Sequence, residues 1–104
     1  MMACGKHVII TDYSAHTQFC NDKNSMLVDI KEEEPAYDGK WFTNGDGTWA
    51  SLDGDPYDQM VEHMRSIYEQ WKTDRSCNTE GIVTSKELTW ARSAKKISEI
   101  ILGE

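Results

Sequence analysis

Two pairs of potential metal ligands lie near the start of the sequence. Cys4 and His7 are separated by two residues, and His16 and Cys20 are separated by three, which is the close pairing that structural zinc sites use. Eight residues lie between the two pairs, whereas familiar zinc fingers leave about twelve or more, and an apolar segment at residues 8–11 occupies half of that space. We therefore expect a packed thiol and ordinary polar histidines here, and zinc is the alternative.

Four oxygen-bearing side chains at residues 44–55 raise the question of a calcium site. An EF-hand loop needs Gly at its sixth position and Glu at its twelfth, but counting from Asn44 these positions hold Trp49 and Asp55. Turn formation and helix capping account for these side chains without a metal. We expect neither metal nor cofactor at this cluster, which consists of Asn44, Asp46, Asp53 and Asp55.

Nucleophilic catalysis would require a hydroxyl or thiol beside a base, and the candidates are Ser14 or Cys20 next to His16. Neither lies in a recognisable nucleophile elbow, and the sequence places no acid to orient the histidine. The glycines of the chain also lack the strand, turn and helix context that a phosphate-binding loop needs. These local motifs therefore assign no catalytic residue.

Aromatic side chains gather at residues 37–49 and could stack on a sugar or a base. Four aromatics around a short hairpin more often cover a small core, so we expect packing to be their role. They are Tyr37, Trp41, Phe42 and Trp49.

Composition limits the classes of partner. The 104 residues include 11 Lys and Arg against 18 Asp and Glu, a formal charge of −7, and no basic cluster is longer than Lys95–Lys96, so we do not expect nucleic acid as a partner. Apolar runs such as Val8–Ile10 are far shorter than the roughly 20 residues of a membrane span, and no signal-peptide layout opens the chain. Three scattered cysteines argue against a disulfide framework. We therefore expect one domain in the cytoplasm, with no membrane span.

Two short apolar segments must form the centre of any sheet. Val8–Thr11 is β-branched throughout, which is typical of a strand covered on both faces in a parallel sheet, and residues 26–30 predict a second strand. The connection between them is long enough for a helical turn and for the right-handed crossover that parallel pairing requires. Gly5, after a short helix-forming run, predicts a helix C-terminal cap.

A hairpin is predicted farther along the chain. Residues 32–35, with three glutamates and a proline, predict a loop. Residues 40–43 and 48–50 predict two strands, and the Asn-Gly-Asp-Gly segment at 44–47 predicts the turn between them, because Asn and Gly accept positive φ at little cost.

The clearest helix starts with Asp55 as N-cap and Pro56 at the first helical position, where the missing N–H has no cost. It extends to about Lys72. Its apolar positions recur at helical spacing and predict a face turned to the core; they are Met60, Met64, Ile67, Tyr68 and Trp71.

A second amphipathic helix has two possible starts. Thr84 forms a capping box with Glu87, whereas Thr89 directly precedes an aromatic residue. Gly103 ends the helix in either case. Its apolar face consists of Trp90, Ala94, Ile97 and Ile101.

Several segments, taken in order, are similar to a known family. The run Met2-Ala3-Cys4-Gly5 followed by Val8-Ile9 resembles a segment that begins Met-Ala-Cys-Gly-x-Pro-Val-Ile, and residues 14–29 resemble the loop and strand that follow it. Residues 35–50 look like an insertion seen in one bacterial branch, and Thr89-Trp90 with Ser93-Ala94 resembles a closing helix. The chain thus resembles the C-terminal part of the nucleotide-sugar-binding domain of retaining, two-Rossmann-domain glycosyltransferases of family four.

This resemblance implies a fold and limits the site. The expected fold is α/β: a single half-domain over residues 1–104, a small partial Rossmann-like unit with a short, largely parallel sheet, a hairpin insertion and two C-terminal amphipathic helices. Two donor-site glutamates of the family precede its Met-Ala-Cys-Gly segment, which opens this sequence, so we carry over no catalytic residue. The expected ligand-facing remnant is the loop with Ser14, His16 and Thr17, although Ala15 stands where that loop usually has Gly.

The function expected from these features is that of a truncated, glycosyltransferase-like protein. It would be non-catalytic alone and act as an interaction module or a vestigial nucleotide-sugar-binding module, with weak affinity. An apolar strand with too few neighbours needs cover, so we expect a homo-oligomer or docking onto a complementing glycosyltransferase chain. The alternative is the C-terminal piece of a split glycosyltransferase that is active only with a partner chain, and a third, weaker hypothesis is a zinc-stabilised regulatory protein.

Overall fold

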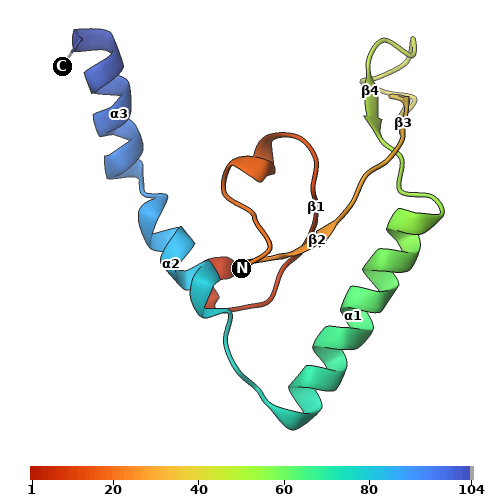
Figure 1. The fold of residues 1–104 in the computed structure, drawn as a ribbon. Helices are drawn as coiled ribbons and strands as arrows, with labels where there is room; N and C mark the ends of the chain where they lie inside the picture. Colours follow the sequence, from red (N-terminus) through yellow and green to blue (C-terminus); the bar gives the residue numbers. More distant parts are fainter. Residues whose placement is uncertain (104) are drawn as a thin grey trace.

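The computed structural model describes residues 1–103 and shows an α/β chain with one parallel and one antiparallel strand pair (Figure 1). It is a small partial Rossmann-like unit, as the sequence predicts. The elements, in order, are the 3-10 helix η1 (Met2–Cys4), β1 (Ile9–Thr11), the 3-10 helix η2 (Ala15–Gln18), β2 (Met26–Val28), β3 (Glu33–Pro35), β4 (Thr48–Ala50), α1 (Asp55–Thr73), α2 (Thr79–Glu87) and α3 (Trp90–Leu102).

The parallel pair β1–β2 confirms the predicted central strands. Ile10 lies opposite Leu27 in the register, and the N–H of Met26 donates to the carbonyl of Val8 at 2.8 Å. β2 is shorter than predicted and ends at Val28, because the N–H of Asp29 donates to a side chain of α1 and not to a neighbouring strand.

Helix α1 lies on this pair through both apolar and polar contacts. Val28 is fully buried. His63 Nε2 bonds the carbonyl of Leu27 at 2.7 Å, and Gln59 Oε1 accepts the N–H of Asp29 at 2.9 Å. Because a buried carbonyl needs a hydrogen-bond donor, the polar side of α1 completes the bonding of a strand that has too few strand neighbours.

The helix starts differ from the predictions in two places. Gly54, with φ of 71°, is the N-cap of α1, and the predicted cap Asp55 forms an ion pair with Lys31 at 2.7 Å instead. Pro56 does lie in the first turn, as predicted. The predicted capping box at Thr84 is wrong, since Thr84 lies inside α2 and its hydroxyl donates to the carbonyl of Glu80.

The alternative start at Thr89 is confirmed, because its hydroxyl accepts the N–H of Arg92 at 3.2 Å and α3 begins at the next residue. Gly103 closes α3 in the left-handed conformation. The C-terminal region therefore contains three helices where two were predicted. The additional helix, α2, is weakly amphipathic and contains Gly81, so its helical state depends on what it contacts.

The hairpin uses a different first strand from the one predicted. β3 pairs antiparallel with β4, with Glu34 opposite Trp49, whereas residues 40–43 form no strand. Asp38 explains this, because its Oδ1 accepts the N–H groups of residues 40, 41 and 42 at 2.8–2.9 Å and closes a turn. The hydrogen bond from the Phe42 N–H, followed by that from Lys40, holds the pKa of Asp38 below its usual value.

Asn78 joins the N-terminal segment and the start of β2 to helix α2. Its Nδ2 donates to the carbonyls of Lys6 at 3.2 Å and Asn24 at 2.8 Å, and its Oδ1 caps α2 by accepting the N–H of Gly81 at 2.9 Å. A Cβ at Gly81 would lie 2.5 Å from that Nδ2, so glycine is needed there. Asn78 and Gly5, whose carbonyl accepts the Asn78 N–H at 2.8 Å, thereby hold α2 against η1.

The chain buries little apolar surface for its length. Within residues 1–103 the buried apolar side chains are few: Cys20, Val28, Ala36 and Pro56. The radius of gyration is 17.5 Å, against about 13 Å for a compact domain of this length, and the accessible surface is 8199 Å², against about 6,000 Å² for a compact monomer of this mass. The chain is flat, with extents of 48, 47 and 22 Å, and α1 and α3 form two separate arms (Figure 1).

Replacement of the buried amide should destabilise the whole chain. Asn78→Ala removes the cap of α2 and leaves two carbonyls without their donor, so we expect the free energy of unfolding to fall by about 2–4 kcal/mol. Urea unfolding followed by circular dichroism measures this. Asn44→Ala, in an exposed loop, is the matched control and should change it by less than about 0.5 kcal/mol; equal midpoints for the two variants would contradict the role of Asn78.

Candidate functional site

The loop after β1 lies at the carboxyl ends of the two parallel strands, the edge at which open α/β sheets bind ligands. His16 folds this loop back on the strand, because its Nε2 lies within hydrogen-bond distance of both the hydroxyl (3.1 Å) and the carbonyl of Thr11. The loop continues through η2 to Cys20, which is buried and whose N–H donates to the carbonyl of His16 at 2.9 Å. The loop is thus folded back onto Thr11, the last residue of β1.

Ser14 has a strained backbone. Its φ of 68° and ψ of −155° lie in a region that essentially only glycine occupies, at a cost of about 1–3 kcal/mol, and such strain concentrates at functional sites. Thr17 holds the strained residue in place, since its hydroxyl donates to the carbonyl of Ser14 at 2.7 Å. In the family that the sequence resembles, the glycine of this loop usually stands one position later, where this chain has Ala15.

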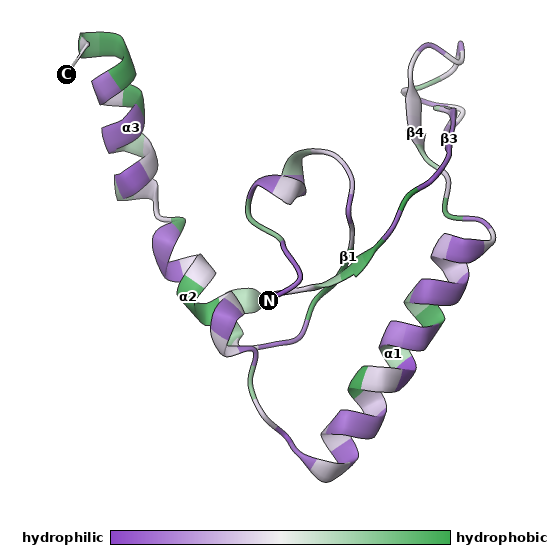
Figure 2. Cartoon of the chain, viewed as in Figure 1, coloured by the Kyte–Doolittle hydropathy of each residue, from purple (hydrophilic) through white to green (hydrophobic). Residues whose placement is uncertain are grey.

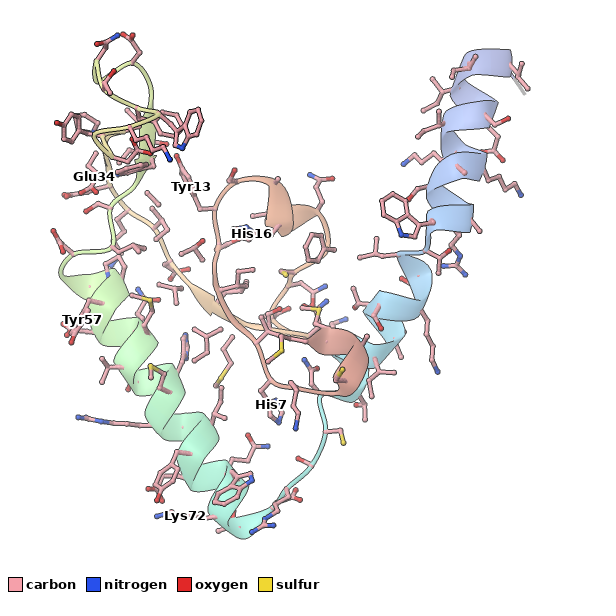
Figure 3. All side chains as sticks on the ribbon, turned by 180° about the vertical axis from the view of Figure 1, so that it is seen from behind. His7, Tyr13, His16, Glu34, Tyr57 and Lys72 are labelled. Carbon is pink, nitrogen blue, oxygen red and sulfur yellow. The ribbon has the colours of Figure 1, made fainter. Side chains whose placement is uncertain are left out.

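A groove of about 490 Å³ separates this loop from the hairpin. Figure 3 shows Tyr13 reaching from the loop toward the hairpin that carries Glu34. The groove is lined on the strand side by Thr11 and Tyr13, and on the hairpin side by Glu34, Trp49, Ala50, Leu52 and Asp53.

Glu33 connects the two walls of this groove. One carboxylate oxygen accepts the hydroxyl of Tyr13 at 2.7 Å, and the other accepts the hydroxyl of Thr48 at 2.6 Å. The hydrogen bond from Thr48, and then that from Tyr13, lowers the pKa of Glu33. The same bond to Glu33 is the main cause that raises the pKa of Tyr13. The two shifts agree, because a hydrogen bond between Tyr13 and Glu33 favours both the protonated phenol and the ionised carboxylate.

The side chains that line the groove determine which ligand chemistry it suits. Two lining side chains, Glu34 and Asp53, are carboxylates, and the lining contains no lysine or arginine, so a diphosphate would meet no neutralising charge within it. Carboxylates accept hydrogen bonds from hydroxyls, and the half-buried Trp49 provides an aromatic surface. The groove therefore suits the hydroxyl-rich end of a ligand better than its phosphate end.

The predicted ligand-facing residues lie in one loop, but their side chains have different surroundings. Thr17 and His16 bond within the loop, and Ser14 is exposed. None of the three lines the groove, whose walls include Tyr13 and Glu34. The sequence did not identify either residue as part of a site. Tyr13 is next to the predicted loop residues in the sequence, whereas Glu34 lines the groove only because residues 33–35 pair with β4.

The four side chains of the zinc alternative are not brought together. His7 Nε2 bonds the carbonyl of Ser76 at 3.2 Å, whereas His16 bonds Thr11. Cys4 is exposed and Cys20 is buried. Over residues 1–103, no group of three or more His, Cys, Asp or Glu side chains is placed to hold a metal ion.

The packing role predicted for the hairpin aromatics is wrong for most of them. Tyr37 is 63% exposed and Trp41 is 77% exposed, because residues 40–43 form a turn at the tip and cover no core. Phe42, itself 47% exposed, contacts Trp49 edge to face at a centroid distance of 6.0 Å. Only Trp49 is held in place, by donation of its Nε1–H to Glu34 at 2.8 Å.

Comparisons of the chain with models of protein families, with curated proteins and with solved structures give no match. The glycosyltransferase resemblance therefore stays a prediction. Within the described residues, no helix is long and apolar enough to cross a bilayer.

Acid should weaken the bridge between loop and hairpin. Because the folded-state pKa of Glu33 is depressed below its ordinary 4.5, its contribution to stability is fully present above that value and is lost as the pH falls through the lower folded-state pKa. We expect the amide resonances of residues 33–35 and 48–50 to lose their dispersion in that window, and Glu33→Gln to remove this step. Glu32→Gln, a neighbouring exposed carboxylate, is the control, and an identical acid profile in both variants would contradict the bridge.

Proposed function

We propose that this chain is a glycosyltransferase-like interaction module, non-catalytic by itself, which works by associating with a further polypeptide surface. The observation that carries the proposal is the uncovered α/β scaffold. A parallel pair is stable when both faces are covered, yet Ile9, Ile10 and Thr11 are all only half-buried. Association would supply the strand and helix neighbours that are absent among the described residues.

A nucleotide-sugar-facing role for the loop is the second part of the proposal. It is supported by the position of the loop at the carboxyl ends of β1 and β2 and by the strained Ser14. The acidic groove beside it limits the affinity, because the diphosphate lacks a cation there. We propose that binding is weak and that the sugar end of the ligand lies next to Trp49 and Glu34.

A split glycosyltransferase is the alternative function, with this chain supplying the C-terminal part of the donor domain. The uncovered β1–β2 pair favours it, since a complementing chain that carries the two donor-site glutamates would extend this sheet. Transfer activity that appears only when such a chain is added would favour this alternative over the non-catalytic module.

We also propose a cytoplasmic location on the basis of the cysteines. All three thiols, Cys4, Cys20 and Cys77, are free, which supports the proposed cytoplasmic location, where thiols stay reduced. The net charge of −7 supports the proposal that nucleic acid is not a partner.

Titration calorimetry with UDP- and GDP-sugars tests the nucleotide-sugar role. We expect a dissociation constant near 1 mM, about −4 kcal/mol, and a weaker one for His16→Ala, because loss of the bonds to Thr11 releases the loop. Gln18→Ala, at the exposed end of the same loop, should bind like the unaltered chain.

Two outcomes would overturn the proposal. The first is equal heats for both sugars and for a sugar-free nucleotide in every variant, which would remove the nucleotide-sugar role. The second is sugar transfer by the purified chain alone, which would remove the non-catalytic assignment.

A further inference from the structure

The hairpin loop, residues 37–47 between β3 and β4, holds two large aromatic side chains in solvent. Trp41 is 77% exposed and Tyr37 is 63% exposed. Figure 1 shows this loop at the free end of the hairpin, away from α1 and from the β1–β2 pair. Because burial of an aromatic ring is strongly stabilising, two rings kept exposed on a projecting loop indicate a binding surface.

Asp38 holds the hairpin loop in one shape. Its Oδ1 accepts the N–H groups of Lys40, Trp41 and Phe42 at 2.8–2.9 Å, and its own N–H donates to the carbonyl of Phe42 at 3.1 Å. Gly39, with φ of 75°, supplies the left-handed conformation that the turn requires. The backbone that carries Trp41 is therefore fixed before a ligand arrives, which lowers the entropy lost on binding.

One face of the Trp41 ring is open to a flat ligand. Lys40 Nζ lies over the ring, 5.2 Å from its centre, and a cation in this position is attracted to that face. Because the residue is 77% exposed, the opposite face is free. The turn uses only Oδ1 of Asp38, so its Oδ2 can accept a hydrogen bond from a ligand hydroxyl.

The surroundings of these rings differ from those of the exposed aromatics on α1. A groove of about 380 Å³ lies between β1 and the second half of α1, where Tyr68 and Trp71 share the walls with Ile9 and Met64. Mixed apolar walls of this kind are typical of the core of a protein interface. Residues 37–47 contain no aliphatic residue, and Figure 2 shows this loop as mainly neutral to hydrophilic, in contrast to the hydrophobic end of α3. The hairpin loop therefore suits a more polar ligand than a protein surface.

Charge excludes the polyanions that also bind to aromatic rings. The hairpin loop carries Lys40 against Asp38 and Asp46, a net charge of −1. Single-stranded nucleic acids stack on aromatic rings beside a basic groove that neutralises their phosphates, and an anionic lipid surface attracts clusters of basic residues. A neutral sugar needs no such charge, because its C–H groups pack on an aromatic face while its hydroxyls bond to neighbouring carboxylates and amides.

We propose that residues 37–47 bind a neutral oligosaccharide, with one sugar ring stacked on the open face of Trp41 and its hydroxyls bonded to polar groups of the loop. β-Linked glucose units suit this surface best, because their ring hydroxyls are all equatorial and both faces of the ring present C–H groups. Tyr37 provides a second aromatic ring on the same loop for a neighbouring sugar unit.

This surface is separate from the groove beside Tyr13. Neither Trp41 nor Tyr37 lines that groove, and the inference goes beyond the proposed function, since it requires neither a nucleotide nor the loop after β1. The titration with nucleotide sugars judges the groove, whereas a titration with an oligosaccharide that lacks a nucleotide judges the hairpin loop. Each can fail while the other succeeds.

Titration of the ¹⁵N-labelled chain with cellohexaose, followed by the indole and amide N–H resonances, tests the proposal. The chain has four tryptophans, and each indole resonance reports on its own surroundings. We expect the Trp41 indole and the amides of residues 37–47 to shift until the site is saturated. The indole of Trp90, on α3, should stay in place.

Two tryptophan variants form a matched pair. Trp41→Ala should weaken binding at least about tenfold, as loss of a central aromatic contact does, and should leave the circular dichroism unchanged because the ring is exposed. Trp90→Ala removes a ring that is 92% exposed and should bind cellohexaose like the unaltered chain.

Two variants of Asp38 test the fixed turn. Asp38→Asn keeps an oxygen that accepts the N–H groups and should bind within about threefold of the unaltered chain, whereas Asp38→Ala frees the turn and should bind more weakly than Asp38→Asn by at least about threefold. The proposal would be overturned by a Trp41 indole that cellohexaose leaves unmoved, by equal binding of the two tryptophan variants or of the two Asp38 variants, or by a thymidine oligonucleotide that binds the loop more tightly than cellohexaose.

Discussion

The structure depends on the parallel pair β1–β2, which is too small to be covered by its own chain. Three residues in each strand provide the centre of a sheet, and only Val28 among them is fully buried. Buried strand groups still need hydrogen-bond partners, so side chains supply them: His63 and Gln59 of α1 bond the edge of β2. The uncovered apolar surface that remains is the basis of the proposed interaction role.

Side-chain amides supply hydrogen bonds that neighbouring strands would supply in a complete sheet. Asn78 and Asn24 tie η1, β2 and α2 together, and Asn24 Nδ2 also reaches Thr84 at 2.9 Å. Polar side chains therefore hold these segments together, whereas α1 and α3 carry large apolar residues that are exposed, such as Trp71 and Trp90. This division separates what folds one copy from what can bind another surface.

The candidate groove and the apolar surfaces have different chemistry. The groove beside Tyr13 is acidic and open, and its walls are joined through Glu33. The groove on α1 is apolar, with Met64, Tyr68 and Trp71 in its wall. Because the lining of the first groove is acidic and that of the second is apolar, the two grooves suit ligands of different chemistry.

The sequence by itself determined the elements whose signals are local. Pattern and capping predicted β1 and β2 and their parallel pairing and the long helix from residue 55, and they gave Thr89 as one of two possible starts for the last helix, because periodicity and an N-cap need only neighbouring residues. Only the tertiary structure decided the rest. β3 forms at Glu33–Pro35 because β4 pairs with it, α2 forms because Asn78 anchors it, and the groove arises where Tyr13 meets Glu34. The face of α1 predicted as core is half exposed, because burial requires a partner surface, and periodicity states only which residues would face one.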